Sequence, residues 1–205
     1  MLRITVFLIC ATLAGFAQTK ASANDWLIVP GVRVGPITAS TTVTDLRRIF
    51  GASNVKDEPI YLGEGFEEPG TVIYSPDKAR SVAILWHDPA DKRGPNRIYL
   101  CRGVVKNCRW HTAGGITMGT NLRLLKKLNG RSLLMSGFDW DYSGTVISWE
   151  GGKLESPGGR LWVRLSPPTS LRHDAVMGDG DFRSSHPEMQ RLDPVIYDLF
   201  VEFAK

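Results

Sequence analysis

Two stretches, TTVTDLRRIFG at Thr41–Gly51 and TNLRLLKKLNG at Thr120–Gly130, align without a gap and decide the expected fold. Apolar residues recur at i, i+3 and i+6 in both, which marks one stripe of a short helix. They are Val43, Leu46 and Ile49 in the first stretch and Leu122, Leu125 and Leu128 in the second. Thr42 and Asn121 stand where an N-cap belongs, and a glycine ends each stretch. We therefore predict two equivalent amphipathic helices, each of which must bury its stripe.

The similarity continues after each helix. Gly65–Glu68 (GFEE) precedes Gly70–Tyr74 (GTVIY), and Gly137–Asp139 (GFD) precedes Gly144–Trp149 (GTVISW). Each unit has the pattern of a helix, an acidic glycine-bounded loop and a β-branched strand. The predicted fold class is α+β, with short helices on one face of an antiparallel sheet built from two tandem helix–strand repeats.

The remaining chain supplies further strands and one long connection. Apolar patterning and turn residues predict strands at Arg131–Met135, Ser81–Trp86, Arg160–Leu165 and Val195–Phe203. Arg97–Cys101 and Cys108–His111 are expected to form a hairpin. Gly178–Pro194 is rich in Gly, Asp, Ser and Pro and is expected to be a long loop.

The first residues have the pattern of a secretory signal peptide. Arg3 supplies a positive charge, Ile4–Ala17 is predominantly apolar, and Ala21–Ala23 forms a small-residue cleavage site. We expect residues 1–23 to be a signal peptide, 24–95 the first repeat and 96–205 the second repeat with a C-terminal strand. The expected location is the periplasm or the extracellular medium.

Composition excludes several classes of protein. Hydrophobic residues make up 42% and charged residues 22% of the 205 residues, which excludes a disordered tail or a coiled coil. Cleavage of the leader removes Arg3 and Lys20, which lowers the formal charge of +4 by two and leaves no electrostatic case for nucleic acid. No later segment approaches the roughly 20 apolar residues of a membrane-spanning helix.

Cysteine usage agrees with an oxidising compartment. Cys10 lies in the leader, so Cys101 and Cys108 remain as an even pair. There is no C-x-x-C motif that would indicate a redox site. We predict a structural disulfide between Cys101 and Cys108.

Gly115–Leu154 resembles a signature of uncharacterised secreted bacterial proteins. The matching parts are GITMGT, the Asn-Gly turn, GFDWDYSG and SWEGGKL. This resemblance implies a bacterial envelope protein and carries no activity. The tandem halves are also similar, at the level of fold, to β-lactamase inhibitory proteins and small outer-membrane assembly lipoproteins.

The acidic loops of the two units carry the candidate binding residues. Aromatic and acidic residues alternate in the second loop, and such a surface combines rigid apolar area with polar handles. The candidates are Phe138, Asp139, Trp140, Asp141 and Tyr142, with Glu64, Glu67 and Glu68 as their counterpart. We predict a non-catalytic protein that binds a protein partner through this surface, either an envelope factor or a hydrolase that it inhibits, and that needs no cofactor.

Two alternatives use the same residues. Asp139, Asp141, Ser143 and Glu150 match positions 1, 3, 5 and 12 of a calcium loop, so the loop would serve a Ca²⁺- or carbohydrate-binding module. The flanking strands argue against an EF-hand. An envelope hydrolase would instead pair a glutamate of the first loop with Asp139 or Asp141 as acid and base.

Overall fold

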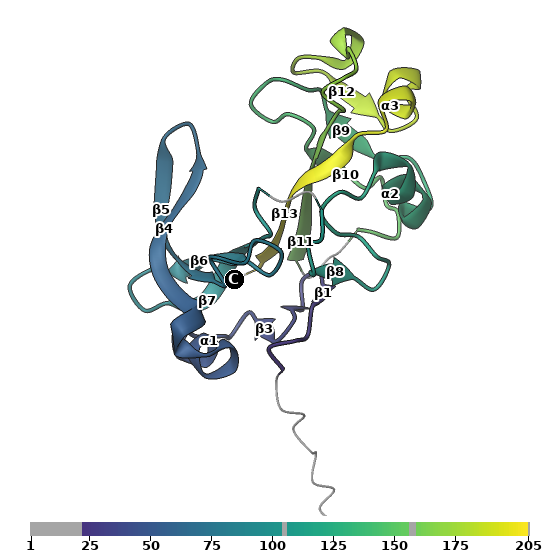
Figure 1. Cartoon of the computed structure of the whole chain (residues 1–205). Coiled ribbons are helices and arrows are strands. Elements are labelled where there is room, and N and C mark those ends of the chain that lie inside the picture. Colours follow the sequence, from purple (N-terminus) through teal and green to yellow (C-terminus); the bar gives the residue numbers. More distant parts are fainter. Residues whose placement is uncertain (1–21, 104–105, 156–158, 205) are drawn as a thin grey trace, which may run out of the picture.

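The computed structural model describes residues 22–103, 106–155 and 159–204 as a mixed α+β fold that consists mostly of antiparallel sheet (Figure 1). Apart from residues 22 and 23, the predicted signal peptide lies outside the described residues. Within the described ranges, no helix has the length and apolar character needed to span a membrane.

The largest sheet has six strands in the order β11-β13-β7-β6-β5-β4, and every neighbouring pair is antiparallel. Its strands are β4 (Val55–Gly63), β5 (Phe66–Ile73), β6 (Val82–Asp88), β7 (Arg93–Leu100), β11 (Gly159–Ser166) and β13 (Val195–Phe203). The predicted last strand is present, and Leu199, Val201 and Phe203 form its buried face by strict alternation. The alternation breaks at the start of the strand, where Ile196 is buried and Tyr197 is not, because the pairing with β11 shifts register there.

Two small sheets complete the strands. The four-stranded sheet, in the order β3-β2-β1-β8, contains β1 (Leu27–Val29), β2 (Arg33–Val34), β3 (Ile37–Thr38) and β8 (His111–Thr112). The three-stranded sheet, in the order β10-β9-β12, contains β9 (Leu134–Ser136), β10 (Val146–Ser148) and β12 (Asp181–Arg183). Strands β1 and β8 form the parallel pair of the four-stranded sheet.

Both predicted helices are present. They are α1 (Val43–Phe50) and α2 (Leu122–Asn129). The chain also contains a third helix, α3 (Pro187–Leu192), and 3₁₀ turns at Ala52–Asn54 and Asp174–Val176. Thr42 Oγ1 accepts the Asp45 amide at 3.2 Å, and Asn121 Oδ1 accepts the Leu124 amide at 3.0 Å. The N-caps are therefore where the sequence predicts them.

The two helices also begin in the same hydrogen-bonded setting. The first amide of α1 donates to the carbonyl of Lys92, just before β7, and the first amide of α2 donates to the carbonyl of Pro194, just before β13. The N-cap residues form isolated bridges to Arg93 and Val195, the first residues of these strands. Because β7 and β13 are neighbours in the large sheet, corresponding helix starts attach to adjacent central strands.

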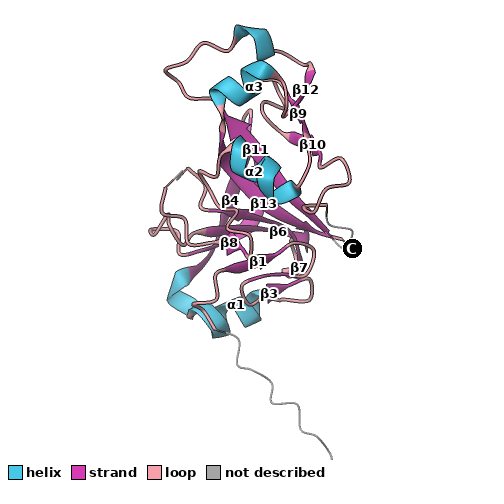
Figure 2. Cartoon of the chain, turned by 90° about the vertical axis from the view of Figure 1, so that its right-hand side faces the viewer, coloured by secondary structure: helices cyan, strands magenta, loops and turns pink. Residues whose placement is uncertain are grey.

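One core cluster joins the helices to the sheets. It includes Leu46 and Phe50 of α1 and Leu122 and Leu125 of α2, all buried. A second, smaller cluster of Ile60, Val72, Leu85 and Tyr99 lies on β4, β5, β6 and β7. In Figure 2, α2 lies near the middle of the molecule in front of β11 and β13, whereas α1 lies at the lower end. The helices therefore do not clearly share one sheet face.

Two expectations about local structure are wrong. Gly178–Pro194 is not a continuous loop, because it contains β12 and α3; Pro187 begins that helix, and its missing amide costs nothing at a helix start. Residues Cys108–His111 do not form a hairpin with β7, whose neighbours are β6 and β13, while β8 pairs with β1.

The predicted disulfide is present. Cys101 and Cys108 are bonded, with their Cα atoms 5.8 Å apart. Cys101 directly follows β7, so the bond closes the loop that leaves the centre of the large sheet. The proposed boundary between two repeats at residues 95 and 96 falls inside β7 and stays a prediction.

Candidate functional site

Strands β4 and β5 extend beyond the large sheet as a two-stranded arm (Figure 1). Glu64 and Gly65 form its turn, with φ of 50° and 82°, which is the two-residue connection that matches the twist of a hairpin. The first four residues of β5 are exposed, and Thr71–Ile73 pair with β6. The tip of the arm is therefore presented to solvent on a base that the sheet holds.

Arg102, two residues after the end of β7, contacts the arm. Arg102 donates to the carbonyl oxygen of Tyr61 and lies over the ring of Tyr99 at 4.8 Å. Because Arg102 adjoins Cys101, the disulfide-closed loop carries the residue that fixes the position of the arm.

The second acidic loop, residues 137–144, is held from both sides. The Gly144 amide donates to the Gly137 carbonyl at 2.9 Å, and the Gly144 carbonyl accepts the Leu165 amide at 2.9 Å. On the other side, Phe138 exchanges backbone hydrogen bonds with Val176 and Gly178. Gly144 has φ of 65°, and a Cβ there would overlap the Leu165 carbonyl, so the close approach requires glycine.

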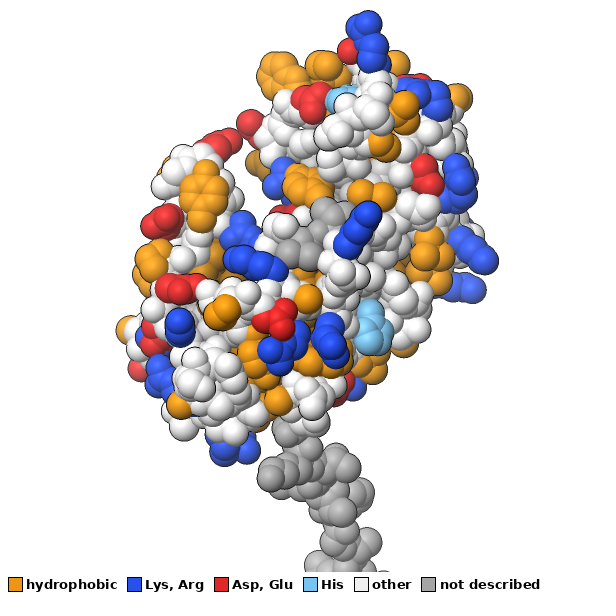
Figure 3. All heavy atoms as spheres, in the orientation of Figure 1, with side chains coloured by type: hydrophobic (Ala, Val, Ile, Leu, Met, Phe, Trp, Pro, Cys, Tyr) orange, Lys and Arg blue, Asp and Glu red, His pale blue; other side chains and the backbone are white. Residues whose placement is uncertain are grey.

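The tip of the arm and this loop line one open cavity of about 620 Å³, here called the arm cleft. The arm contributes Leu62, Gly63, Glu64, Phe66 and Glu68, and the body contributes Asp139, Trp140, Asp141 and Arg164. Figure 3 shows the hollow between arm and body, with acidic side chains on both of its rims. Two acidic segments more than 70 residues apart in the sequence thus face one space.

The carboxylates of the arm cleft differ in their partners. Glu64, Glu68 and Asp141 form no ion pair with any residue that the structure describes. Asp139 Oδ2 lies 2.6 Å from Nε2 of His173. The guanidinium group of Arg164 donates hydrogen bonds to backbone carbonyl oxygens of the loop, at 3.1 Å to Asp141 and at 3.5 Å to Ser143. The cleft therefore keeps a net surplus of negative charge.

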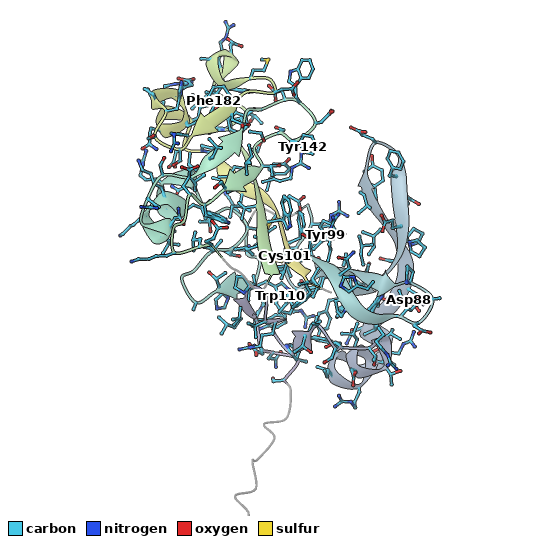
Figure 4. The ribbon with its side chains drawn as sticks, turned by 180° about the vertical axis from the view of Figure 1, so that it is seen from behind. Asp88, Tyr99, Cys101, Trp110, Tyr142 and Phe182 are labelled. Atoms are coloured by element: carbon cyan, nitrogen blue, oxygen red, sulfur yellow. A yellow bond between two sulfur atoms is a disulfide. The ribbon has the colours of Figure 1, made fainter. Side chains whose placement is uncertain are left out.

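Exposed aromatic side chains accompany these acids. Phe66 on the arm is 68% exposed and Trp140 on the loop is 58% exposed, although both are large apolar residues. Tyr142 is 75% exposed, and Figure 4 places it on the side of the body that faces the arm. Exposed aromatic rings of this kind are typical of interface anchors.

Three of the predicted residues do not line the arm cleft: Phe138, Glu67 and Tyr142, the last of which lines a second cavity behind the loop. Phe138 is fully buried in the core, with its ring 5.7 Å from that of His173, so it anchors the loop and is not available to a partner. Glu67 lines a separate hollow of about 430 Å³ along the arm, together with Asp57 and Lys92. Neither Phe66 nor Arg164 was among the predicted binding residues. The alignment of Phe66 with Phe138 was the available signal, but the prediction chose Phe138, which is the buried member of the pair.

A second cavity, here called the loop pocket, lies behind the same loop and has a volume of about 550 Å³. Trp140 and Asp141 line both cavities, so the loop forms the ridge between them. The far wall of the loop pocket comes from Trp162 on β11 and from Asp179 and Asp181. Nothing in the sequence joined the last two residues to the predicted loop.

The calcium prediction gains no support from this geometry. Glu150, the residue at position 12 of the calcium pattern, pairs with Arg183 at 3.0 Å, and Asp139 pairs with His173. Within residues 22–103, 106–155 and 159–204, no group of three or more His, Cys, Asp and Glu residues could hold a metal ion.

Asp198 on β13 is partly buried. Burial raises the pKa of the Asp198 carboxyl, and the guanidinium groups of Arg102 and Arg164 act in the opposite direction. These arginines are the same residues that fasten the arm and the loop.

No protein-family model, curated protein or solved structure matches this chain.

Proposed function

We propose that this protein is a non-catalytic binding protein of the periplasm or the extracellular medium, and that a basic segment of a partner protein docks in the arm cleft. The observation that carries the proposal is the meeting of two acidic segments, each with an exposed aromatic residue, across one cavity. Aromatic anchors supply binding energy, and the unpaired carboxylates select and orient a cationic partner.

The compartment rests on two features. A Cys101–Cys108 disulfide is favoured in an oxidising environment, and the residues before the described part have the pattern of a signal peptide.

We infer in addition that the chain arose from a duplicated helix–strand unit. The aligned segments start α1 and α2 with matching caps and matching hydrogen bonds to adjacent strands. Within this alignment, Phe66 is exposed where Phe138 is buried. An apolar side chain that is buried in one unit and exposed in the other supports a partner contact at the exposed position.

Site-specific photo-crosslinking tests the docking site. A photoreactive residue is placed at Phe66, at Trp140 and, as a control away from the cleft, at the 59%-exposed Val32, and each protein is expressed with its own signal sequence. We expect the same cross-linked partner from positions 66 and 140 and none from position 32. The partner yield should fall with Glu68→Gln combined with Asp141→Asn, and with added salt.

Equal cross-linking from all three positions would rule out the arm cleft as the docking site. An undiminished yield from the charge-neutral double variant would remove the requirement for a basic partner segment.

A further inference from the structure

The loop pocket combines aromatic walls with carboxylates. Trp140, Tyr142 and Trp162 contribute three rings, and Asp141, Asp179 and Asp181 contribute three carboxylates. A volume of about 550 Å³ lies in the range of small-molecule sites, roughly 300–1,000 Å³. The pocket is therefore large enough for a compact organic ligand.

Its charge is one-sided. The lining contains no Lys, Arg or His, and the carboxylates of Asp141, Asp179 and Asp181 have no ion pair or side-chain hydrogen bond within the described part of the chain. A negatively charged pocket with only hydrogen-bond acceptors among its charged groups favours a cation over a neutral or anionic ligand.

The kind of cation follows from how these groups are arranged. A hard metal ion needs several oxygens that converge on one point, and the described residues provide no such group. A cation with a diffuse charge and an apolar surface instead interacts with ring faces, and it needs carboxylates only nearby. Alkylated ammonium groups have these properties.

We propose that the loop pocket binds a quaternary or alkylated ammonium group, with Trp140, Tyr142 and Trp162 around its methyl groups and Asp141, Asp179 and Asp181 as counter-charges. This site goes beyond protein docking in the arm cleft. Tyr142, Trp162, Asp179 and Asp181 line the loop pocket and not the arm cleft, so the two sites can be tested separately.

Calorimetric titration of the full mature chain with choline and with its neutral isostere 3,3-dimethyl-1-butanol tests the proposal. We expect choline to bind at least about tenfold more tightly, which corresponds to about 1.4 kcal/mol of cation-specific attraction. Equal affinity for the two compounds, or binding of N-acetylglucosamine without binding of choline, would overturn it.

Two variants locate the ligand. Tyr142→Leu and Asp181→Asn alter exposed side chains and should each weaken choline binding by about threefold to tenfold. Trp162 is a poor choice for substitution, because its ring stacks on Phe200 at 5.6 Å and its Nε1 donates to Glu202 at 2.7 Å. Phe66→Leu, in the arm cleft, is the control and should leave choline affinity unchanged. Unchanged affinity in both pocket variants would contradict the proposed site.

Vesicles of phosphatidylcholine distinguish the two sources of the ammonium group. Co-sedimentation that Tyr142→Leu abolishes would assign the group to a lipid headgroup. Choline binding without co-sedimentation would assign it to a free small molecule.

Discussion

Nε2 of His173 lies 2.6 Å from Oδ2 of Asp139, and Nδ1 of the same ring faces the carbonyl oxygen of Leu171 at 3.3 Å. The Asp139 carboxylate and the Leu171 carbonyl thus lie on either side of the His173 ring, although Asp139 is 34 residues away in the sequence. The ring also packs against the buried ring of Phe138. This contact ties the acidic loop to the segment that follows β11.

The pH dependence of stability should report this contact. Burial alone would lower the pKa of His173, but the hydrogen bonds to Asp139 and Leu171 outweigh it and the pKa is raised. Because the folded pKa exceeds the unfolded value of about 6.5, the stabilisation is complete below that pH and is lost as pH rises through the folded pKa. The charges of Asp174 and Glu188 act in the same direction.

The measurement is the free energy of unfolding in urea between about pH 5.5 and 8.5 for wild type and His173→Gln. We expect the difference between the two proteins to shrink as pH rises, by less than about 1 kcal/mol because Asp139 is half exposed. If the difference in unfolding free energy between the two proteins is constant or grows with pH, the protonated form of His173 is not the one that the contact with Asp139 stabilises.

Gly144 should be intolerant of any side chain. Gly144→Ala places a Cβ against the Leu165 carbonyl, and residue 144 also has a positive φ, which strains any residue with a side chain. We expect the free energy of unfolding to fall by about 3 kcal/mol or more. Gly115→Ala is the matched control, because Gly115 also has a positive φ, 83°, and nothing lies within 4 Å of its added Cβ. In denaturant unfolding, the control should lose only about 1 kcal/mol of unfolding free energy. Equal losses in the two variants would show that the clash with Leu165 does not contribute.

Arg102 should control the order of the arm. Its removal in Arg102→Ala breaks the bond to the Tyr61 carbonyl and the contact with the Tyr99 ring, and an isolated two-stranded ribbon is only marginally stable. We expect amide hydrogen exchange in residues 60–69 to accelerate while the centre of the sheet stays protected. Lys56→Ala, an exposed substitution on β4, should change nothing. Similar exchange in both variants would refute the role of Arg102.

The N-caps of α1 and α2 should contribute similarly to stability. Thr42→Ala and Asn121→Ala each remove the acceptor for an otherwise unpaired helix amide, so each should cost about 1 kcal/mol in urea unfolding. Replacing the exposed Ser40, which precedes the first cap, with Ala serves as the control and should have little effect. A negligible effect at either cap would remove one support for equivalent units.

Local patterns account for what the sequence predicted well. Caps, apolar stripes and terminal glycines act within a few residues, so both helices begin and end near the predicted positions. Helix α3 has only six residues, which is too short to show a clear helical periodicity among the surrounding turn-forming residues. The prediction of one long loop over Gly178–Pro194 is wrong for this reason. The burial of Phe138 and the exposure of Phe66 could not be distinguished, because their local sequences are nearly the same.

The sequence by itself determined the mixed α+β class, the Cys101–Cys108 disulfide and the acidic-aromatic character of the two loops. Only the tertiary structure decided that these loops face each other across one cleft and that Trp162, Asp179 and Asp181 form a second pocket behind one of them. Helix periodicity and capping depend on neighbours along the chain. The position of the arm depends on strand pairing across the whole sheet and on one arginine beside a disulfide, which no local pattern records.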